Sequence, residues 1–558
     1  MSDTDVIIVG AGAGGLAAAW RLTTRGVRVI LLEAGRQYDQ ARDYPQVSDD
    51  FELRQFPYDP NTDEAGRPRY GFGPAQEVGR EWTAYRSYTR GQGRHVPGNA
   101  RWYDSYAHAR GVGGSTLSFQ GEAHRYHPDS LRMQSLFGAG VDWPFPYTEL
   151  EPYYDLTERQ IGVAAPADNP FRPRTLPPVL PAHRLSYASA RLVPAFASVG
   201  ATLQPNSVAI LSEPYAGRPS CNYCNSCTNG CPIGDKGSAD VTFFPPALET
   251  GRLDLRTNAQ AIRIDVDGSG RAAAVIYRDA SDSLHRVTGR FVVLAGGAVE
   301  TARLLLLSTS PSFPDGLANR SGQVGEHLTE ALFWQSTGFL PDRVDSYRGI
   351  PIDGTAWDFA IPQHRANGCV GGFRLSTAHG AAGLRGPAFY AEQLVPGFGL
   401  AHQRRMAAVF GHAVALLAIG DWLPNASTKV DLDPALRDAS GLPVARITSY
   451  LGDNERALLK LMADTTRHIL AAAGAEIVEE TSAIDLFATA HVLGTCRMDV
   501  DPAASVADAG GFSHDVPNLA FADGSLVPSS GSGDSPMLTI TALALRTADR
   551  LLDRAKHI

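Results

Sequence analysis

Near its N-terminus the chain has a short run of apolar, largely β-branched residues, Asp5–Gly10, which is typical of a buried parallel strand. A glycine-rich turn follows. The next segment, Leu16–Arg25, has the composition of a helix, with alanines where close packing needs small residues. A second apolar run, Val27–Leu32, ends at Glu33. These patterns predict a parallel βαβ unit.

The turn between the first strand and the helix has the spacing Gly-x-Gly-x-x-Gly. We predict that Gly10 and Gly12 let the backbone approach a pyrophosphate and that Gly15 lets helix and strand pack closely. The N-terminus of the helix presents unpaired N–H groups to the phosphates. Glu33 lies 18 residues after Gly15, where a carboxylate accepts hydrogen bonds from a ribose. The unit as a whole favours a dinucleotide site over a plain glycine turn.

Two further features favour FAD as the dinucleotide. The second strand ends in Glu33-Ala34-Gly35, an ending of the FAD type. A later strand and turn, Phe291–Thr301, resembles the second glycine motif found in many FAD enzymes. It runs into a leucine-rich helix, Ala302–Leu307.

Length and charge narrow the class of protein. A chain of 558 residues exceeds one simple domain, so we expect at least two interwoven lobes. The net charge of -9 without basic clusters argues against nucleic acid as a partner. The most apolar long stretch, Met406–Leu423, contains His412 and Asp421, which predicts a buried strand or helix and no membrane span. No signal peptide is visible, so we expect a cytoplasmic protein, or a periplasmic one exported together with a partner.

Four blocks, in order and spacing, resemble the signatures of the glucose–methanol–choline (GMC) oxidoreductases. They are Ala109–Thr116, Leu294–Leu304, His491–Met498 and Asn518–Pro528. The resemblance covers nearly the whole chain. It implies an α/β fold (α+β overall), with a Rossmann-like FAD-binding domain and a second, substrate-binding lobe built on an antiparallel sheet with helices.

The resemblance also implies the limits of the two lobes and the residues that hold FAD. The FAD lobe is expected to comprise residues 1–125, 200–325 and 485–558, with a cysteine-rich insertion at 215–240, and the substrate lobe residues 126–199 and 326–484. The residues expected to bind FAD are Gly10, Gly12, Gly15, Glu33, Ala34, Arg110, Gly113, Gly114, Ser115, Asp523, Gly524 and Met537. Because Leu117-Ser118-Phe119 contains no histidine, we expect the FAD to be non-covalent.

By resemblance, the catalytic histidine of the family falls on His491. An imidazole can take the proton of an alcohol while hydride leaves for flavin N5, so His491 is predicted to be the general base. The alternative is a buried structural histidine before Gly494. The family's second active-site residue, usually His or Asn, falls on Ser535, which can hydrogen-bond a substrate hydroxyl but cannot act as a base near pH 7. Ser535 before Pro536 also fits a helix N-cap, alone or together with a substrate contact. In either case the N-terminus of the helix Met537–Leu552 would stabilise the negative charge of reduced flavin.

Four of the six cysteines, Cys221, Cys224, Cys227 and Cys231, have the spacing C-x2-C-x2-C-x3-C-P of bacterial ferredoxins. This run resembles the cysteine-rich insertion of bacterial FAD sugar dehydrogenases of the glucose and glucoside 3-dehydrogenase type, which implies an iron–sulfur cluster. Free or disulfide-bonded thiols and a zinc site are the alternatives. A cluster would pass electrons to an external acceptor, such as a cytochrome, and the complex could include a small subunit.

The function expected from this resemblance is FAD-dependent oxidation of an alcohol, on a sugar or glycoside. One alternative is an FAD alcohol oxidase that acts on a bulkier apolar alcohol with O2. An alternative of another class is a flavoprotein that only relays electrons. Substrate contacts are expected from residues 350–363 and 373–403, which carry mixed polar and aromatic side chains.

Overall fold

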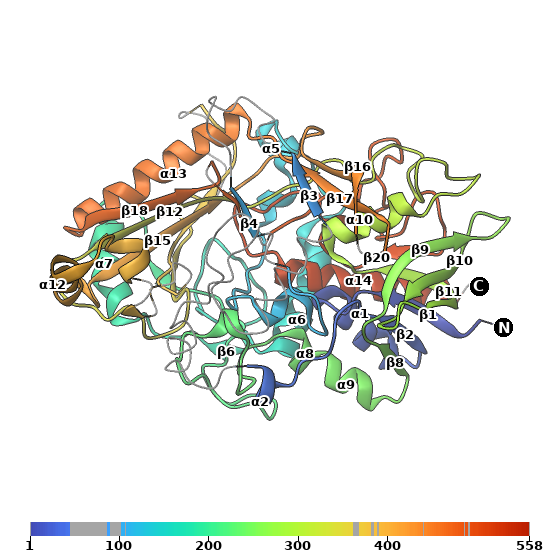
Figure 1. Ribbon diagram of the computed structural model, residues 1–558, viewed down its shortest axis with the longest axis horizontal. Coiled ribbons are helices and arrows are strands. Elements are labelled where there is room, and N and C mark those ends of the chain that lie inside the picture. The colour runs from blue at the N-terminus through green and yellow to red at the C-terminus, as the bar shows by residue number, and fades with distance from the viewer. Residues whose placement is uncertain are drawn as a thin grey trace.

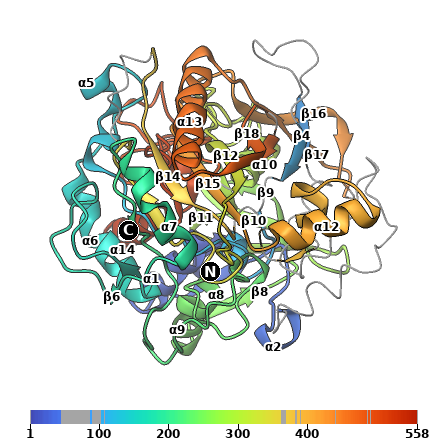
Figure 2. The same cartoon turned by 90° about the vertical axis from the view of Figure 1, so that its left-hand side faces the viewer.

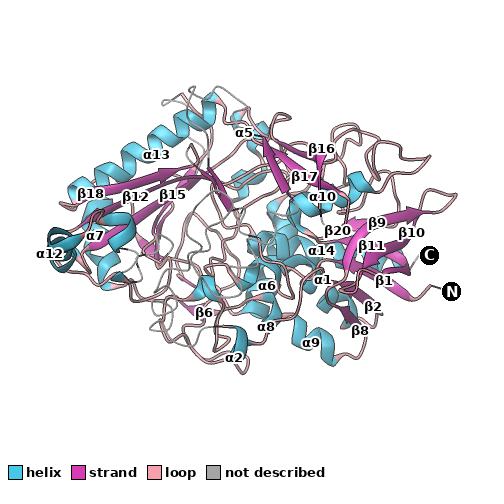
Figure 3. Cartoon of the chain, in the orientation of Figure 1, coloured by secondary structure: helices cyan, strands magenta, loops and turns pink. Residues whose placement is uncertain are grey.

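The structure is a computed structural model. It describes residues 2–44, 86–89, 102–105, 108–360, 368–380, 384, 386–387, 390–438, 440–484, 486–488 and 491–556. Two large sheets lie toward opposite ends of the molecule, and both chain termini lie at the end that holds the first sheet (Figure 1). Long loops occupy much of the region between the sheets (Figure 3). The fold is therefore the two-lobed α/β fold that the sequence predicts.

The first sheet has the order β8-β2-β1-β11-β10-β9, with β20 paired to β11. Its inner strands are parallel, whereas β9, β10 and the first half of β11 form an antiparallel extension. The strands are β1 (Thr4–Val9), β2 (Val29–Leu32), β8 (Leu253–Arg256), β9 (Gln260–Val266), β10 (Ala272–Arg278), β11 (Leu284–Leu294) and β20 (Leu519–Phe521). The parallel strands are apolar and buried, as expected for a sheet covered on both faces.

Helix α1 (Ala13–Thr23) connects β1 to β2 and packs against the last helix, α14 (Met537–Ala555). A salt bridge joins the two helices, with Arg21 Nε 2.7 Å from Asp549 Oδ1. Helix α14 also packs against α6 (Tyr147–Ile161). The last helix of the chain is thus fixed beside the first βαβ unit.

The second sheet is antiparallel, with the order β18-β12-β15-β14-β13-β7. Its strands are β7 (Gln204–Pro205), β12 (Leu332–Phe339), β13 (Gly354–Ala356), β14 (Phe373–Thr377), β15 (Ala413–Gly420) and β18 (Glu476–Ser482). Helix α13 (Asp453–Ala472) packs on one face through β12, β15 and β18. Figure 2, which looks at this lobe from its end, shows α13 above the sheet and α12 (Gly399–Val409) to its side.

The remaining elements lie around these two sheets. The helices are α2 (Gln40–Asp43), α5 (Met133–Phe137), α7 (Tyr187–Ala197), α8 (Ala239–Thr242), α9 (Phe244–Glu249) and α10 (Gly297–Leu307). The strands of the smaller sheets are β3 (Arg86–Thr89), β4 (Trp102–Ser105), β5 (Ala164–Ala165), β6 (Leu180–Pro181), β16 (Lys429–Arg437), β17 (Pro443–Thr448) and β19 (Leu486–Ala488).

Two sequence predictions about these elements can be compared with the structure. The apolar stretch Met406–Leu423 forms the end of α12 and then the buried strand β15, and no helix among the described residues is long and apolar enough to cross a membrane. The lobe limits stay a prediction. Within them, β7 comes from the stretch assigned to the FAD lobe, yet it pairs with β13 of the second sheet.

Candidate active site

The turn between β1 and α1 has the close packing that its glycines predict. Gly10 has a φ of 104°, and a Cβ there would lie 2.3 Å from the carbonyl oxygen of Ala295. A Cβ on Gly15 would lie 1.9 Å from the Gly10 oxygen, so helix and strand can meet only at a glycine. At Gly12, by contrast, a Cβ would meet only the Gly114 Cα, at 4.0 Å. The space beside Gly12 is open, as backbone approach to a pyrophosphate requires.

These contacts revise the roles of two glycines. Gly10 was expected to admit the pyrophosphate, but in the structure its missing side chain makes room for the end of β11. Sequence reasoning did not single out Gly14, although a Cβ there would lie 1.7 Å from the Ala522 oxygen, after β20. The glycines therefore serve the packing of α1 on three strands as well as the cofactor site.

The Glu33 side chain is buried at the end of β2 and closes the turn. Its carboxylate accepts hydrogen bonds from the N–H of Ala11 (2.8 Å) and of Gly35 (2.7 Å). Burial raises the pKa of Glu33, and these two N–H donors lower it. Each carboxylate oxygen has a further lone pair, so ribose hydroxyls can be additional donors to Glu33.

The loop of the first family block lies directly against this turn. The N–H of Gly113 donates to the Ala11 oxygen (2.8 Å), and a Cβ on Gly114 would lie 2.6 Å from the Gly12 Cα. A short 3-10 helix, η2 (Gly114–Leu117), begins here and leaves Ser115 partly exposed. Arg110, at the start of the loop, acts electrostatically on Glu33. The predicted cofactor residues of the two blocks therefore come together.

Asp523 joins the second glycine motif to the C-terminal block. Its Oδ2 accepts from the Gly297 N–H (2.9 Å) and the Thr301 hydroxyl (2.6 Å), and its Oδ1 accepts from the N–H (2.9 Å) and hydroxyl (2.5 Å) of Ser525. The carboxylate is buried. Asp523 thus holds the start of α10 against the turn η7 (Gly524–Leu526). Both elements belong to blocks that are expected to surround the flavin.

The block that begins at His491 is held on both sides. The Gly494 N–H donates to the Gly524 oxygen (3.0 Å), and Leu493 exchanges two backbone hydrogen bonds with Thr329 (3.0 and 3.1 Å). His491 itself is half-buried at the start of the block. Its dense surroundings and the guanidinium of Arg374 lower the pKa of His491 to about 3. The imidazole is therefore neutral at pH 7, the state in which it can accept a proton.

This shift of the pKa predicts how alcohol oxidation depends on pH. If neutral His491 is the base, activity falls only where the pH drops below its lowered pKa, so the acid limb of kcat/KM should lie well below pH 6.5. Arg374→Gln removes a positive charge and should raise the pKa of His491, which moves the acid limb to higher pH. Arg374→Lys keeps the charge and should leave the limb in place. A limb that is the same in both variants would contradict this explanation.

Ser535 differs from one of its predicted roles. The N-cap of α14 is Pro536 and has no side-chain capping hydrogen bond, so the N-cap interpretation of Ser535 is wrong. The Ser535 N–H donates to Nδ1 of His124 (3.0 Å). Its hydroxyl has no hydrogen-bond partner among the described residues, although the residue is only 7% exposed. The hydroxyl is available to a ligand.

A buried network of charged side chains surrounds the loop before α14, and sequence reasoning missed it. Arg172 binds Asp534 with Nη2 2.7 and 2.8 Å from the two carboxylate oxygens. Arg374 on β14 donates to the Gly533 oxygen (2.8 Å) and to Glu122 (2.7 Å). Arg172 is paired with Asp534 and Arg374 with Glu122, so both arginines position the loop.

Asp421 fixes the same loop from the end of β15. Its carboxylate accepts hydrogen bonds from the Ser530 hydroxyl (3.0 Å) and from the N–H (2.5 Å) and hydroxyl (3.2 Å) of Ser532. The polar residue inside the apolar stretch Met406–Leu423 was the one sequence signal for this network. The loop before α14 is rich in Gly and Ser, like a flexible linker, so its sequence did not indicate a buried network.

Trp357, from the segment 350–363 that was expected to contact the substrate, packs against this charged network. Its ring packs on the guanidinium of Arg172 (3.8 Å to the ring centre) and edge-on against His124 (4.8 Å between ring centres). Asp353 instead has a structural role, because it accepts hydrogen bonds from the hydroxyls of Ser189 on α7 and Thr377 on β14. Within the two suggested segments, residues 361–363, 381–383, 385, 388 and 389 lie outside the described residues.

The four clustered cysteines were predicted to bind an iron–sulfur cluster, and the structure does not support that prediction. No group of three or more His, Cys, Asp or Glu side chains in the described part of the chain is arranged to hold a metal ion. Cys231 donates to Asp235 (2.6 Å), and burial raises the pKa of the thiols of Cys227 to about 12 and of Cys231 to about 11. The described residues therefore do not show the convergence of cysteines that a cluster requires.

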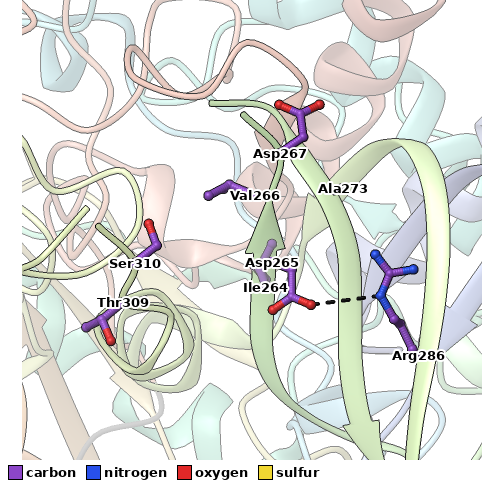
Figure 4. A pocket seen from close by; sticks show the side chains of 8 residues that line it. All are labelled: Ile264, Asp265, Val266, Asp267, Ala273, Arg286, Thr309 and Ser310. Atoms are coloured by element: carbon purple, nitrogen blue, oxygen red, sulfur yellow. Dashed lines mark ion pairs between the residues drawn. The ribbon is translucent and has the colours of Figure 1, made fainter. Parts of the chain in front are cut away.

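A separate hollow of about 390 Å³ lies at the antiparallel edge of the first sheet (Figure 4). In it, Asp265 on β9 and Arg286 on β11 come from the two strands that flank β10, and Arg286 Nε lies 3.9 Å from Asp265 Oδ2. Its lining residues are Ile264, Asp265, Val266, Asp267, Ala273, Arg286, Thr309 and Ser310. None belongs to the blocks around His491, Ser535 or the glycine turn, so this hollow is not the candidate active site.

Comparison with known proteins identifies the family of the chain. Residues 214–331 and 424–544 match two family models described as GMC oxidoreductase, and residues 8–39 match one described as NAD(P)-binding Rossmann-like domain. The 6'''-hydroxyparomomycin C oxidase of Streptomyces lividus is 30% identical over 99% of this chain and 93% of its own. The 2-methyl-1,2-propanediol dehydrogenase of Mycolicibacterium austroafricanum is 28% identical over 100% of this chain and 96% of its own. The fructose dehydrogenase large subunit of Gluconobacter japonicus is 28% identical over 99% of this chain and 98% of its own.

Among solved structures, a pyridoxine 4-oxidase from Mesorbium loti has a TM-score of 0.63 at 18% identity, and a formate oxidase has 0.64 at 15%; each match covers 99% of both chains. These likenesses show the fold. Fold, cofactor blocks and relatives together define an FAD-dependent oxidoreductase that acts on an alcohol group. The chain belongs to the GMC oxidoreductase family.

Proposed function

We propose that the enzyme oxidises a hydroxyl group of a sugar, a glycoside or a related polyhydroxy compound, with His491 as general base. The observation that carries this proposal is the neutral, half-buried imidazole of His491, beside a block that is hydrogen-bonded to the cofactor motifs. The names of three relatives support the substrate class, since they denote enzymes of fructose, of paromamine and of an aminoglycoside.

The residues present fit FAD. The open space beside Gly12, the Glu33 carboxylate and the loop around Ser115 would hold the dinucleotide, and the N-terminus of α14 at Met537 would face its ring system. When bound, FAD supplies the two-electron acceptor for the hydride of the carbinol carbon. His491 takes the proton of the substrate hydroxyl and so makes that hydride available.

Ser535 orients the substrate hydroxyl by a hydrogen bond from its own hydroxyl, which has no other partner among the described residues. We expect Ser535→Ala to lower kcat/KM roughly three- to ten-fold, the effect of one neutral hydrogen bond. FAD content should not change. Steady-state kinetics with a dye acceptor measure the effect. A variant with wild-type kcat/KM would remove Ser535 from the site.

The electrons leave for an external acceptor, and we derive no step through the cysteine segment. Two relatives, the fructose dehydrogenase large subunit and the gluconate 2-dehydrogenase flavoprotein of Pantoea cypripedii, are named as components of larger enzymes, which supports a separate acceptor protein. Two others are named oxidases, which favours O2 as the alternative acceptor.

The proposal is tested with a panel of polyols, free sugars, glycosides and apolar alcohols, with dye reduction and oxygen uptake measured in parallel. The expected result is the highest kcat/KM on a polyhydroxy compound, with dye reduction faster than oxygen uptake. Highest activity on a long apolar alcohol, with stoichiometric peroxide, would replace the proposal by the oxidase alternative. No activity on any alcohol would favour an electron relay.

A further inference from the structure

We propose that His124 is a positioning residue for this reaction: it holds the backbone of Ser535 so that the serine hydroxyl faces the substrate. This inference rests on the proposed function, because it assigns a task to the side chain behind Ser535. His124 comes from the segment that follows η2, more than 400 residues before Ser535 in the chain. It thus connects the loop of the first family block to the loop before α14.

The hydrogen bonds of His124 define which ring nitrogen carries the proton. Nε2 lies 3.0 Å from Oδ1 of Asn206, and Nδ1 accepts the Ser535 N–H at 3.0 Å. The Asn206 amide has a fixed orientation, because its Nδ2 donates to Glu122 (3.0 Å) and to the Ile352 oxygen (3.2 Å). Its Oδ1 must therefore be the acceptor, so Nε2 of His124 donates and Nδ1 is a bare acceptor.

Burial and two arginines keep the ring neutral, although a carboxylate lies on each side of it. Glu122 lies 3.6 Å from Nε2 and Asp534 lies 3.7 Å from Nδ1. Each carboxylate is neutralised by an arginine, Glu122 by Arg374 and Asp534 by Arg172. Burial and these two arginines hold the pKa of His124 well below its ordinary value, and nearby His491 acts in the same direction. A neutral imidazole with both nitrogens engaged cannot serve as a second base, but it is a rigid acceptor.

The Ser535 loop needs such an acceptor. Ser532 has a φ of 59°, and a Cβ on Gly533 would lie 1.9 Å from the Ile419 oxygen, so the loop follows an unusual path pressed against β15. Among the described residues, the N–H of Ser535 is held by His124, whereas its hydroxyl has no partner. The direction of the hydroxyl therefore depends on where His124 places the backbone.

Two amide substitutions separate this role from simple packing. His124→Asn places an amide oxygen near the position of Nδ1 and can still accept the Ser535 N–H. His124→Gln places its amide near Nε2 and can satisfy only Asn206. Both lose the ring that packs on Trp357, so both should lower the melting temperature similarly. We expect His124→Asn to keep kcat/KM within about three-fold of wild type and His124→Gln to lose about ten-fold or more.

A double-mutant cycle with Ser535→Ala completes the test. If His124 acts through the serine hydroxyl, His124→Gln should cost little in the Ser535→Ala background. Equal losses in His124→Asn and His124→Gln, or full additivity with Ser535→Ala, would overturn the proposal. A wild-type enzyme without activity on any alcohol would instead show that the proposed function itself has failed.

Histidine ¹⁵N spectra give a readout that is independent of turnover. The signals of the His124 ring are assigned as those that disappear in both His124 variants. Their chemical shifts should stay roughly constant between pH 5.5 and 8, because the ring remains in the neutral Nε2–H form.

Discussion

Replacing His491 by alanine or glutamine should lower kcat for alcohol oxidation by roughly 10²- to 10⁴-fold, the usual contribution of a positioned general base. The physical reason is that no other neutral base is available among the described side chains at the site: His124 has both nitrogens engaged, and Ser535 cannot take a proton near pH 7. Steady-state kinetics at saturating substrate measure the loss.

The control for this variant is His285→Ala, which removes an exposed imidazole from the antiparallel part of β11 in the first sheet. It should have wild-type kcat. FAD content should be the same in both variants, because His491 is not among the residues expected to hold the dinucleotide. A His491→Ala enzyme that keeps more than about a tenth of wild-type kcat would exclude a general-base role.

Alanine substitutions at two glycines of the turn between β1 and α1 should have different effects, one on FAD binding and the other on stability. Gly12 has an extended backbone that alanine can adopt, and a Cβ there would enter open space. We therefore expect Gly12→Ala to fold, with a free energy of unfolding of the apoprotein within about 1 kcal/mol of wild type, but to lose FAD. A Cβ on Gly15 would lie 1.9 Å from the Gly10 oxygen, so Gly15→Ala should destabilise the protein itself by about 3 kcal/mol or more.

Denaturant unfolding of the apoproteins and visible flavin absorbance after reconstitution distinguish these outcomes. The pair is matched, because each variant adds the same methyl group to the same turn, three residues apart. If Gly12→Ala bound FAD as tightly as wild type, the space beside Gly12 would not be the site of the pyrophosphate.

The sequence predicted the first βαβ unit and dinucleotide binding from local patterns, and the resemblance to the GMC family implied the two-lobed fold. A glycine spacing, a β-branched run and a terminal acid each act within a few residues of one another. One prediction near the end of the chain, the N-cap role of Ser535, was wrong. Serine before proline is a strong local signal for an N-cap, yet Pro536 takes that position and the Ser535 N–H turns toward His124.

The charged network could not be predicted because its members come from distant parts of the chain. Arg172, Arg374 and Asp534 are each unremarkable in sequence, and only the packing of the second sheet against the Gly- and Ser-rich loop makes them partners. The cysteine run shows the opposite case. Its spacing is a strong local pattern, but metal binding requires convergence of thiolates, and the described residues do not show that convergence.

The most direct test of the central claim is anaerobic mixing of the purified FAD-loaded enzyme with a preferred polyhydroxy alcohol. If the protein is an FAD-dependent alcohol oxidoreductase with His491 as base, the visible flavin absorbance bleaches in a single turnover, and His491→Ala bleaches at least about 100-fold more slowly. Flavin that stays oxidised with every alcohol, while a chemical reductant still bleaches it, would contradict the account.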